Sequence, residues 1–275
     1  MPELPETETM ARDLERFVSG ARIEAMTVTR PDVLREVTKA AFRKRVTGAT
    51  IVRCWRRAKL VVLDLSTGDR IAVQPRFTGA LLIDSGQLAE SQRRYSTVAF
   101  TLSDGRKLHY RDVRRLGTVS LMSPVRWEEY SGALGIEPLD RAFDVAYLSG
   151  LVRGSRQAIK KLIMDQRQLV GVGNIYANEA LWDAGIDPSR AAKALVPAEI
   201  ASLRDAIVNV LRRAVEARGT SIRDYVDSTG ERGDFGPHLS AYGREGLPCE
   251  RCGARLIGTH AIDGRATVLC ARCQR

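Results

Sequence analysis

The sequence predicts an α+β protein of several domains. It begins with a helix and an eight-stranded β-sandwich, continues with a helical lobe and ends in a cysteine-rich hairpin. Three observations support this prediction. Short apolar or alternating segments fill the first 123 residues, helical periodicity dominates the middle of the chain, and four of the five cysteines lie in the last 27 residues. Strands gathered in one part of a chain and helices in another favour separate lobes.

The first segment, residues 5–18, is expected to form a helix. Pro5 suits a first helical turn, and Met10, Leu14 and Phe17 recur at helical spacing. Eight strands are then expected, because glycine-containing turns separate several of the apolar runs. The expected strands are residues 23–29, 50–55, 60–65, 71–74, 80–83, 97–102, 107–110 and 118–122.

Strand signals end at Pro124, and the next part of the chain is expected to be helical. The expected helices are residues 145–152, 156–165, 175–184 and 198–218. Residues 220–243 are polar and contain several glycines, which favours a mobile loop. The predicted domains are therefore a β-sandwich domain at 1–123, a linker at 124–142, a helical domain at 143–237 and a cysteine-rich hairpin domain at 238–275.

The charge of the chain indicates a polyanionic partner. Lysine and arginine number 43 against 33 acids, which gives a net charge of +10 and a pI near 9.7. Such a balance favours nucleic acid as the partner, and arginine dominates the local clusters. The clustered arginines are Arg53, Arg56, Arg57, Arg111, Arg114 and Arg115.

The ends of the chain carry no signal for a membrane or for export. No apolar run reaches 18 residues, so no membrane span is expected. The first ten residues, MPELPETETM, carry acids where a secretory signal would carry basic residues and an apolar run. We therefore expect a cytoplasmic protein, in a bacterium and associated with the nucleoid through DNA. Nothing in the sequence indicates oligomerisation, and a monomer is expected.

The C-terminal cysteines predict one structural zinc ion. Two C-x2-C pairs, with 17 residues between them, can clamp a tetrahedral metal, and the intervening span suits a two-stranded hairpin. A cytosolic chain disfavours disulfides as the alternative. The four predicted ligands are Cys249, Cys252, Cys270 and Cys273. Cys54 lies outside this cluster and is expected to be a small buried side chain on a strand.

The N-terminus contains a candidate nucleophile. Removal of Met1 leaves Pro2 with a free secondary amine, which can attack an aldehyde-like sugar carbon, and Glu3 beside it can move protons. Taken alone, the segment is explained more simply as a helix start whose acids complement the helix dipole. Lys59, which leads an apolar strand, is likewise explained alone as a solvated lysine at a strand end.

The segment Gly171-Val172-Gly173-Asn174 predicts a tight turn before a helix. Asn174 is a good N-cap residue, and a turn whose backbone N–H groups point outward can bind phosphate. A plain turn between helices explains the same four residues.

Five motifs in order give the chain a strong resemblance to a known family. They are PELPE at 2–6, RRAK at 56–59, D-x-RR-x-G at 112–117, LVGVGNIYANEAL at 169–181 and the cysteine-rich segment at 242–274. The chain resembles the formamidopyrimidine-DNA glycosylase/endonuclease VIII family along nearly its whole length. The segment 228–235 is similar to the lesion-capping loop of the formamidopyrimidine branch, which favours oxidised purines. The resemblance implies a two-lobe fold, in which residues 143–237 form a helix–two-turn–helix DNA-binding domain and residues 238–275 form a β-hairpin zinc finger.

The resemblance implies a bifunctional DNA glycosylase and abasic-site lyase of base excision repair, acting on double-stranded damaged DNA without an organic cofactor. Pro2 would form a Schiff base with C1′ of the damaged nucleotide, and Glu3 would protonate the opening sugar ring. Lys59 would contact phosphate beside the lesion, and β- and δ-elimination would then cut the strand.

The resemblance also implies DNA contacts in the second half of the chain. Asn174 and Lys160 would assist at the phosphates, and Arg265 would clamp the phosphates that flank the flipped nucleotide.

The region that fills the space of the flipped base departs from the family pattern. The formamidopyrimidine branch usually has a Met, an Arg and a Phe there. In this chain the Met position is Phe77, the Arg is Arg114, with Arg115 beside it, and the Phe is Leu116. Phe77 and Leu116 are still bulky and apolar, so they can act as a wedge. We expect the altered shape to change which opposite base is tolerated.

Two other functions are consistent with parts of the sequence. A paralogue that binds damaged or abasic DNA with weak or altered excision would explain the changed wedge region. A zinc-ribbon protein associated with RNA or transcription would explain the cysteines and the charge, although it would not need PELPE at its terminus.

Overall fold

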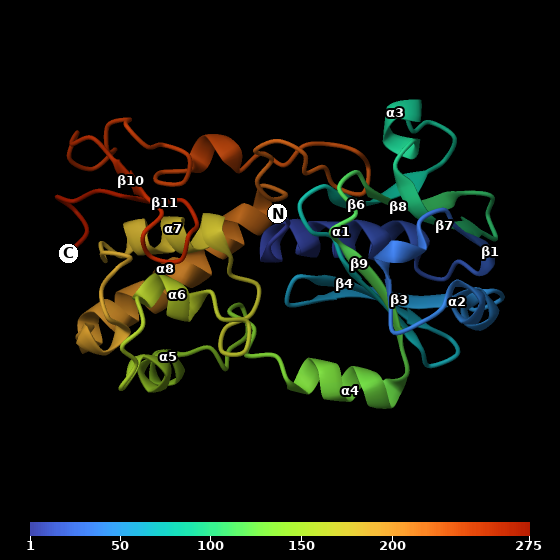
Figure 1. Cartoon of the computed structure of the whole chain (residues 1–275), viewed down its shortest axis with the longest axis horizontal. Coiled ribbons are helices and arrows are strands. Elements are labelled where there is room, and N and C mark those ends of the chain that lie inside the picture. The colour runs from blue at the N-terminus through green and yellow to red at the C-terminus, as the bar shows by residue number, and fades with distance from the viewer. The chain divides into compact units, whose positions relative to one another are not determined.

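The computed structural model describes residues 1–275 and divides the chain into two compact units. Unit 1 comprises residues 1–133 and 217–234, and unit 2 comprises residues 134–216 and 235–275. Figure 1 colours the chain by residue number, so that both segments of each unit can be followed. None of the helices combines the length and apolar character that a membrane crossing requires.

Unit 1 is built on two β-sheets, and all eight strands expected from the sequence are present. The strands are β1 (Ile23–Val28), β2 (Leu34–Arg35), β3 (Ile51–Arg57), β4 (Leu60–Leu65), β5 (Arg70–Gln74), β6 (Gly79–Asp84), β7 (Ser96–Leu102), β8 (Lys107–Asp112) and β9 (Thr118–Met122). One sheet has the order β1-β7-β8-β6 and the other β2-β9-β5-β4-β3. The additional strand, β2, pairs in parallel with β9. It was not predicted because its two residues are too few to show an alternating pattern.

Alternating side chains of the two sheets form the core of unit 1. On β7, for example, Val98, Phe100 and Leu102 are buried in the apolar cluster, whereas Ala99 and Thr101 are partly exposed on the opposite face. Cys54 is buried on β3, so the prediction of a small buried side chain on a strand is confirmed.

The helices of unit 1 are α1 (Leu4–Val18), α2 (Lys39–Val46), α3 (Glu90–Arg93) and α4 (Pro124–Gly132), with a 3-10 turn at Pro31–Val33. Helix α1 lies across β3 and β4 and buries Met10 and Leu14, as its periodicity predicts (Figure 1). Helix α4 occupies the first half of the segment expected to be a linker. The Ser123 side chain caps it by accepting a hydrogen bond from the Arg126 N–H.

Unit 2 contains the expected helices and a C-terminal hairpin. Its elements are α5 (Val145–Val152), α6 (Ile159–Ile163), α7 (Asn174–Asp183), α8 (Pro197–Glu216), β10 (Ile257–Thr259), β11 (Thr267–Leu269) and 3-10 turns at Ala192–Ala194 and Gly236–His238. Helix α8 packs on α5 and α7. Helix α6 is shorter than the 156–165 segment predicted, because Ala158 pairs with Ala191 in a β-bridge, which holds the chain extended just before Ile159.

Candidate active site

The candidate nucleophile lies at the start of α1 in unit 1. Pro2 is buried directly before the helix, Met1 is half exposed, and Glu3 is the N-cap residue with 2% of its surface exposed. The backbone N–H of Glu3 donates to Glu6 Oε2 at 2.7 Å, and the Thr7 hydroxyl donates to the Glu3 carbonyl at 2.8 Å. This capping box holds the backbone on the C-terminal side of Pro2 in one conformation.

Glu6 also connects the helix start to the second segment of unit 1. Its other oxygen, Oε1, accepts a hydrogen bond of 2.7 Å from the backbone N–H of Thr220. The hydroxyl of Tyr225 donates to the Arg218 carbonyl at 3.1 Å, and burial raises the pKa of this phenol well above its usual range. The N-terminus and residues 218–225 are therefore held by one carboxylate and one buried tyrosine.

The segment after Tyr225 is folded onto unit 1, which corrects the expectation of one mobile loop over residues 220–243. Asp227 and Ser228 are fully buried, and Asp227 Oδ1 accepts hydrogen bonds from the backbone N–H groups of Thr229 and Glu231. Asp227 Oδ2 accepts from Arg218. Burial raises the pKa of Asp227, but the Arg218 and Thr229 hydrogen bonds outweigh it, so the net pKa is lowered. Before Tyr225, the side chain of Ile222 is exposed.

Lys59 lies in the tight turn between β3 and β4. Arg57 and Leu60 form the last pair of the two strands, so Ala58 and Lys59 make a two-residue turn, with Ala58 at φ +54°. Lys59 is 9% exposed and is therefore a buried lysine, in contrast to the solvated strand-end residue that is the simpler interpretation of its sequence position. The strands that carry it are the ones on which α1 packs.

The structure brings the predicted wedge residues Phe77 and Arg114 together. The guanidinium of Arg114 lies 4.6 Å from the centroid of the Phe77 ring, within the range of a cation–π contact. Phe77 and Leu116 are both 41% exposed, and Phe77 has a left-handed φ of +49°. Arg115 points elsewhere and forms an ion pair with Asp32 at 3.1 Å. Two large apolar side chains and one arginine are thus displayed to solvent at neighbouring turns.

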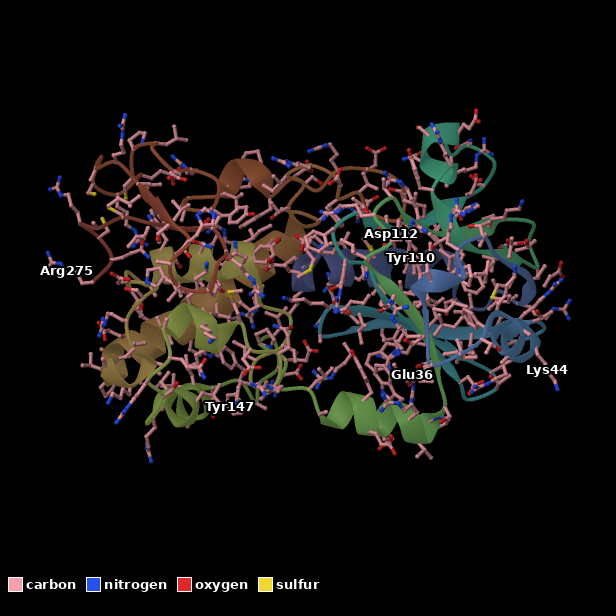
Figure 2. The ribbon with its side chains drawn as sticks, in the orientation of Figure 1. Glu36, Lys44, Tyr110, Asp112, Tyr147 and Arg275 are labelled. Atoms are coloured by element: carbon pink, nitrogen blue, oxygen red, sulfur yellow. The ribbon has the colours of Figure 1, made fainter.

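A buried carboxylate, Asp112, connects these turns through hydrogen bonds. Its Oδ1 accepts from the Thr78 hydroxyl at 2.6 Å, and its Oδ2 accepts from the Gly117 N–H at 2.8 Å and from the Tyr110 hydroxyl at 3.3 Å (Figure 2). The Thr78 hydroxyl oxygen also accepts the Arg114 N–H at 3.0 Å. Asp112 therefore joins the turn that carries Phe77 to the turn that carries Arg114.

In unit 2, Lys160 and Asn174 meet at the backbone next to Arg265. Lys160 is fully buried, and its Nζ donates to the Ala266 carbonyl at 3.2 Å and to the Thr267 hydroxyl at 2.7 Å. The Asn174 amide donates to the same Ala266 carbonyl at 2.9 Å. Gly173, with an extended backbone, is the N-cap of α7, so the expectation that Asn174 is the cap is wrong. The Asn174 side chain instead binds the backbone of the C-terminal hairpin segment at Ala266.

Arg265 is exposed at the edge of a polar pocket. Its N–H donates to Asp263 Oδ1 at 3.1 Å, and its guanidinium lies 3.6 Å from Asp263 Oδ2. The pocket has a volume of about 500 Å³ and is also lined by Lys161 and Arg167. Asp165 and Asp263 also line the opening and pair with Arg167 and Arg265, so three cations against two carboxylates leave an excess of one positive charge for an anion such as phosphate.

The four C-terminal cysteines converge as the sequence predicts. Their sulfur atoms lie within 4.8 Å of one another, and the Cys249–Cys273 and Cys252–Cys270 pairs are 4.0 Å and 3.5 Å apart. Four sulfurs at about 2.3 Å from a tetrahedral Zn²⁺ would be about 3.8 Å apart, so the donor set fits this ion. Arg251, between the first two cysteines, stacks on Trp182 at 4.1 Å and donates to the Asp183 carbonyl.

Sequence reasoning missed three buried carboxylates that position the candidate residues. Glu6 and Asp112 are described above. Glu179 on α7 accepts hydrogen bonds from the N–H groups of Ser240, Ala241 and Tyr242. Burial raises the pKa of Glu179, and these hydrogen bonds act in the opposite direction. Glu6 had a readable signal, because E-x-x-E across a helix start is a capping pattern.

Comparisons with known proteins agree with this architecture. A family model described as the N-terminal domain of formamidopyrimidine-DNA glycosylase matches residues 1–119, and one described as its H2TH domain matches residues 134–226. The formamidopyrimidine-DNA glycosylase of Pelotomaculum thermopropionicum is 38% identical over 277 residues, which cover 100% of this chain and 99% of that protein. The enzyme of Xanthomonas euvesicatoria pv. vesicatoria is 40% identical over 275 residues, with 100% of both chains covered.

Solved structures of Lactococcus lactis Fpg are similar over the full length. One complex, with DNA that contains N7-benzyl-Fapy-dG, has a TM-score of 0.91 at 30% identity and covers 100% of both chains. Another, with DNA that contains an abasic site, has a TM-score of 0.91 at 30% identity and covers 99% of both. The sandwich, the H2TH helices and the four-cysteine hairpin define the class of two-lobed H2TH proteins. The chain belongs to the formamidopyrimidine-DNA glycosylase family.

Proposed function

We propose that this protein is a DNA glycosylase and abasic-site lyase of base excision repair that excises oxidised bases, with oxidised purines favoured. The observation that carries the proposal is the placement of Pro2 and Glu3, buried and fixed by the Glu6 capping box at the start of α1. The relatives named above are called formamidopyrimidine-DNA glycosylases, and the similar structures hold a modified Fapy-dG or an abasic site in DNA.

The proposed reaction starts when Met1 is removed and the Pro2 nitrogen becomes an amine. The nitrogen forms a bond to C1′, the damaged base leaves, and the C1′–O4′ bond opens to give an iminium while Glu3 donates a proton to O4′. The iminium accepts the electron pair released when C2′ loses a proton, and the 3′ phosphate leaves. A second elimination releases the 5′ phosphate, and hydrolysis frees Pro2.

The remaining residues are proposed to hold DNA. Lys59 and Arg265 would bind phosphates next to the damaged nucleotide. Lys160 and Asn174 would act at the same phosphates by shaping the backbone at Ala266, to which both donate hydrogen bonds.

Wedge residues are proposed to enter the space that the flipped base leaves. Phe77 and Leu116 would fill it, and Arg114 would meet the opposite base, with Arg115 at the neighbouring backbone. A second candidate function is a paralogue that binds damaged or abasic DNA with weak or altered excision. Phe77 supports it, because this branch usually has a Met at that position.

The C-terminal hairpin is proposed to hold one Zn²⁺ through four thiolates. A closed S4 site has no open coordination position, so the ion would stabilise the fold of the hairpin and its arginine. We also propose that the protein is a monomer in the bacterial cytoplasm, associated with the nucleoid through DNA.

Borohydride trapping tests the proposed reaction. Duplexes that carry an abasic site, 8-oxoguanine or thymine glycol are incubated with the protein and reduced, and a covalent adduct is expected because borohydride converts the iminium to a stable amine. The intact mass of the native protein should show that Met1 is absent. A variant with one residue added before Pro2 should give no adduct, since its proline nitrogen is an amide. Pro2→Gly should trap less.

The test separates the two candidate functions. A correctly processed protein that binds the abasic duplex but yields no adduct with any of the three substrates would be the binding paralogue. Adduct formation that survives the N-terminal extension would rule out Pro2 as the nucleophile.

A further inference from the structure

A basic groove crosses the exposed face of the four-stranded sheet in unit 1. It has a volume of about 880 Å³ and runs over β1, β7 and β8, with residues 93–95 as one wall. The sheet residues in it, such as Thr27, Ala99 and Thr101, are the outward-facing members of their strands. The groove is therefore formed by the face of the sheet that does not contribute to the core.

Cationic side chains dominate the lining of this groove. They are Arg30, Arg93, Arg94, Lys107 and Arg115. The single carboxylate among the lining residues is Asp112, which is buried and accepts three hydrogen bonds from within unit 1. Arg93 lies 3.8 Å from Asp84, and Arg115 is paired with Asp32. Arg30, Arg94 and Lys107 are exposed and take part in no ion pair.

The floor of the groove is polar and is formed largely by hydroxyl groups. The Ser96 hydroxyl lies 2.9 Å from His109 Nδ1, and Thr27 and Thr101 add two more hydroxyl groups. Burial lowers the pKa of His109, although Asp84 acts in the opposite direction. Hydroxyl groups between fixed cations can donate to phosphate oxygens, whereas the core of a protein–protein interface is usually apolar.

The groove is continuous with the segment that carries the predicted wedge. Val113 and Arg115 line it, and Arg114 lies between them in the chain. We propose that this groove binds the phosphodiester backbone of DNA beyond the base pairs at the lesion, as a second contact surface of the same protein. The inference rests on the proposed function, because that function brings DNA to Arg114.

Paired charge reversals test the groove. Arg94→Glu with Lys107→Glu reverses two of its three cations that form no ion pair, and Arg43→Glu with Lys44→Glu is the matched control. Arg43 and Lys44 are exposed on α2, outside the groove, and Lys44 projects from the edge of unit 1 (Figure 2). The dissociation constant for a 30-base-pair duplex with a central tetrahydrofuran site is measured from about 50 to 200 mM salt, the range over which phosphate contacts dominate.

The groove variant is expected to bind roughly tenfold more weakly, or worse, at about 0.1 M salt. The slope of log association constant against log salt concentration is negative, and for this variant it should become less steep by about 2, since each lost phosphate contact contributes about 0.9. The control should lose far less. A neutral variant, Arg94→Gln with Lys107→Gln, should show the same change in slope. It serves as a check in case the charge-reversed variant does not fold.

Equal losses in the groove and control variants would overturn the inference. Single-turnover cleavage of an abasic duplex at saturating protein keeps the two proposals apart. If the unaltered protein cleaves and the groove variant binds as the control does, only the groove proposal fails. If the unaltered protein does not cleave, the proposed activity fails, and the affinities still decide whether the groove binds DNA.

Discussion

Glu6 is a single side chain that fixes the backbone around the proposed nucleophile, Pro2. Its two oxygens accept separate hydrogen bonds, from the Glu3 N–H and from the Thr220 N–H, each at 2.7 Å. A carboxylate can accept at both oxygens, whereas an amide offers one acceptor and one donor group. Glu6 is therefore expected to position the terminus and residues 218–225 together.

Replacement of Glu6 by Gln is expected to disrupt one of these two hydrogen bonds. A buried N–H without an acceptor costs about 1–3 kcal/mol in the free energy of unfolding, which denaturant titration would measure. The single-turnover rate of abasic-site cleavage should fall roughly 10- to 100-fold, because small displacements of a nucleophile are costly.

Glu24→Gln is the matched control for this substitution. Glu24 is exposed and pairs with Arg22 at 3.3 Å, so its stability should change by less than about 0.5 kcal/mol. Equal cleavage rates in the Glu6 variant and the unaltered protein would show that Glu6 does not position Pro2.

Among the elements, the turn between β8 and β9 is tightly packed at Gly117. Gly117 lies where β8 returns to β9, and a Cβ atom added there would overlap the Tyr110 hydroxyl and approach the Gln74 carbonyl oxygen to 2.6 Å. The same glycine donates its N–H to Asp112. Close packing of backbone, tyrosine and carboxylate is therefore what shapes the turn that displays Arg114.

Gly117→Ala is expected to destabilise unit 1 by about 1–3 kcal/mol or more, because neither the strand backbone nor a buried tyrosine can move freely. Gly132→Ala provides the comparison, since a Cβ atom at Gly132 meets nothing within 4 Å. Thermal unfolding of both variants measures the effect. If the two alanine variants unfold at the same temperature, the crowding at Gly117 is not a constraint in solution.

At the scale of the whole molecule, the order of the chain does not match the division into units. Residues 217–234 follow the last long helix of unit 2 but belong to unit 1, where Arg218 donates to Asp13 and Asp227. The cysteine hairpin then returns to unit 2, where Arg251 stacks on Trp182. The proposed nucleophile, Pro2, and the cysteine hairpin are thus parts of different units.

Removal of zinc is therefore expected to act on one unit only. A chelator should unfold the cysteine hairpin and weaken binding to an abasic-site duplex, because Arg265 loses its fixed backbone. The Pro2 amine should still react with a small aldehyde under borohydride, and mass spectrometry of the N-terminal peptide would detect the product. Unchanged DNA binding after complete loss of the metal would contradict the role given to the hairpin.

The long periodic elements could be predicted from the sequence, and the short ones could not. All eight expected strands are present. Each carries a run of apolar side chains that is buried on one face, as in β7, or on both faces, as in β4 and β6. Helix α2 was not predicted, because Phe42 and Val46 are its only two buried residues and reveal no stripe. Its N-cap, Thr38, was the available signal.

The candidate residues were predictable where their chemistry is local. The spacing of the four cysteines predicts their convergence, and Pro2 with Glu3 depends only on chain order. Lys160 and Asn174 were expected to face phosphate, yet both donate to the Ala266 carbonyl, which lies 106 and 92 residues away in the chain. No local pattern encodes a contact of that range.

The sequence by itself determined the strands, the main helices, the cysteine cluster and the family to which the chain belongs. The tertiary structure alone decided the partners of the buried charges. Glu6, Asp112 and Lys160 are each held by groups distant in the sequence, because a buried polar atom must find a partner wherever the fold provides one. Local periodicity indicates which face of an element is buried, but it does not indicate which residues of other elements pack against that face.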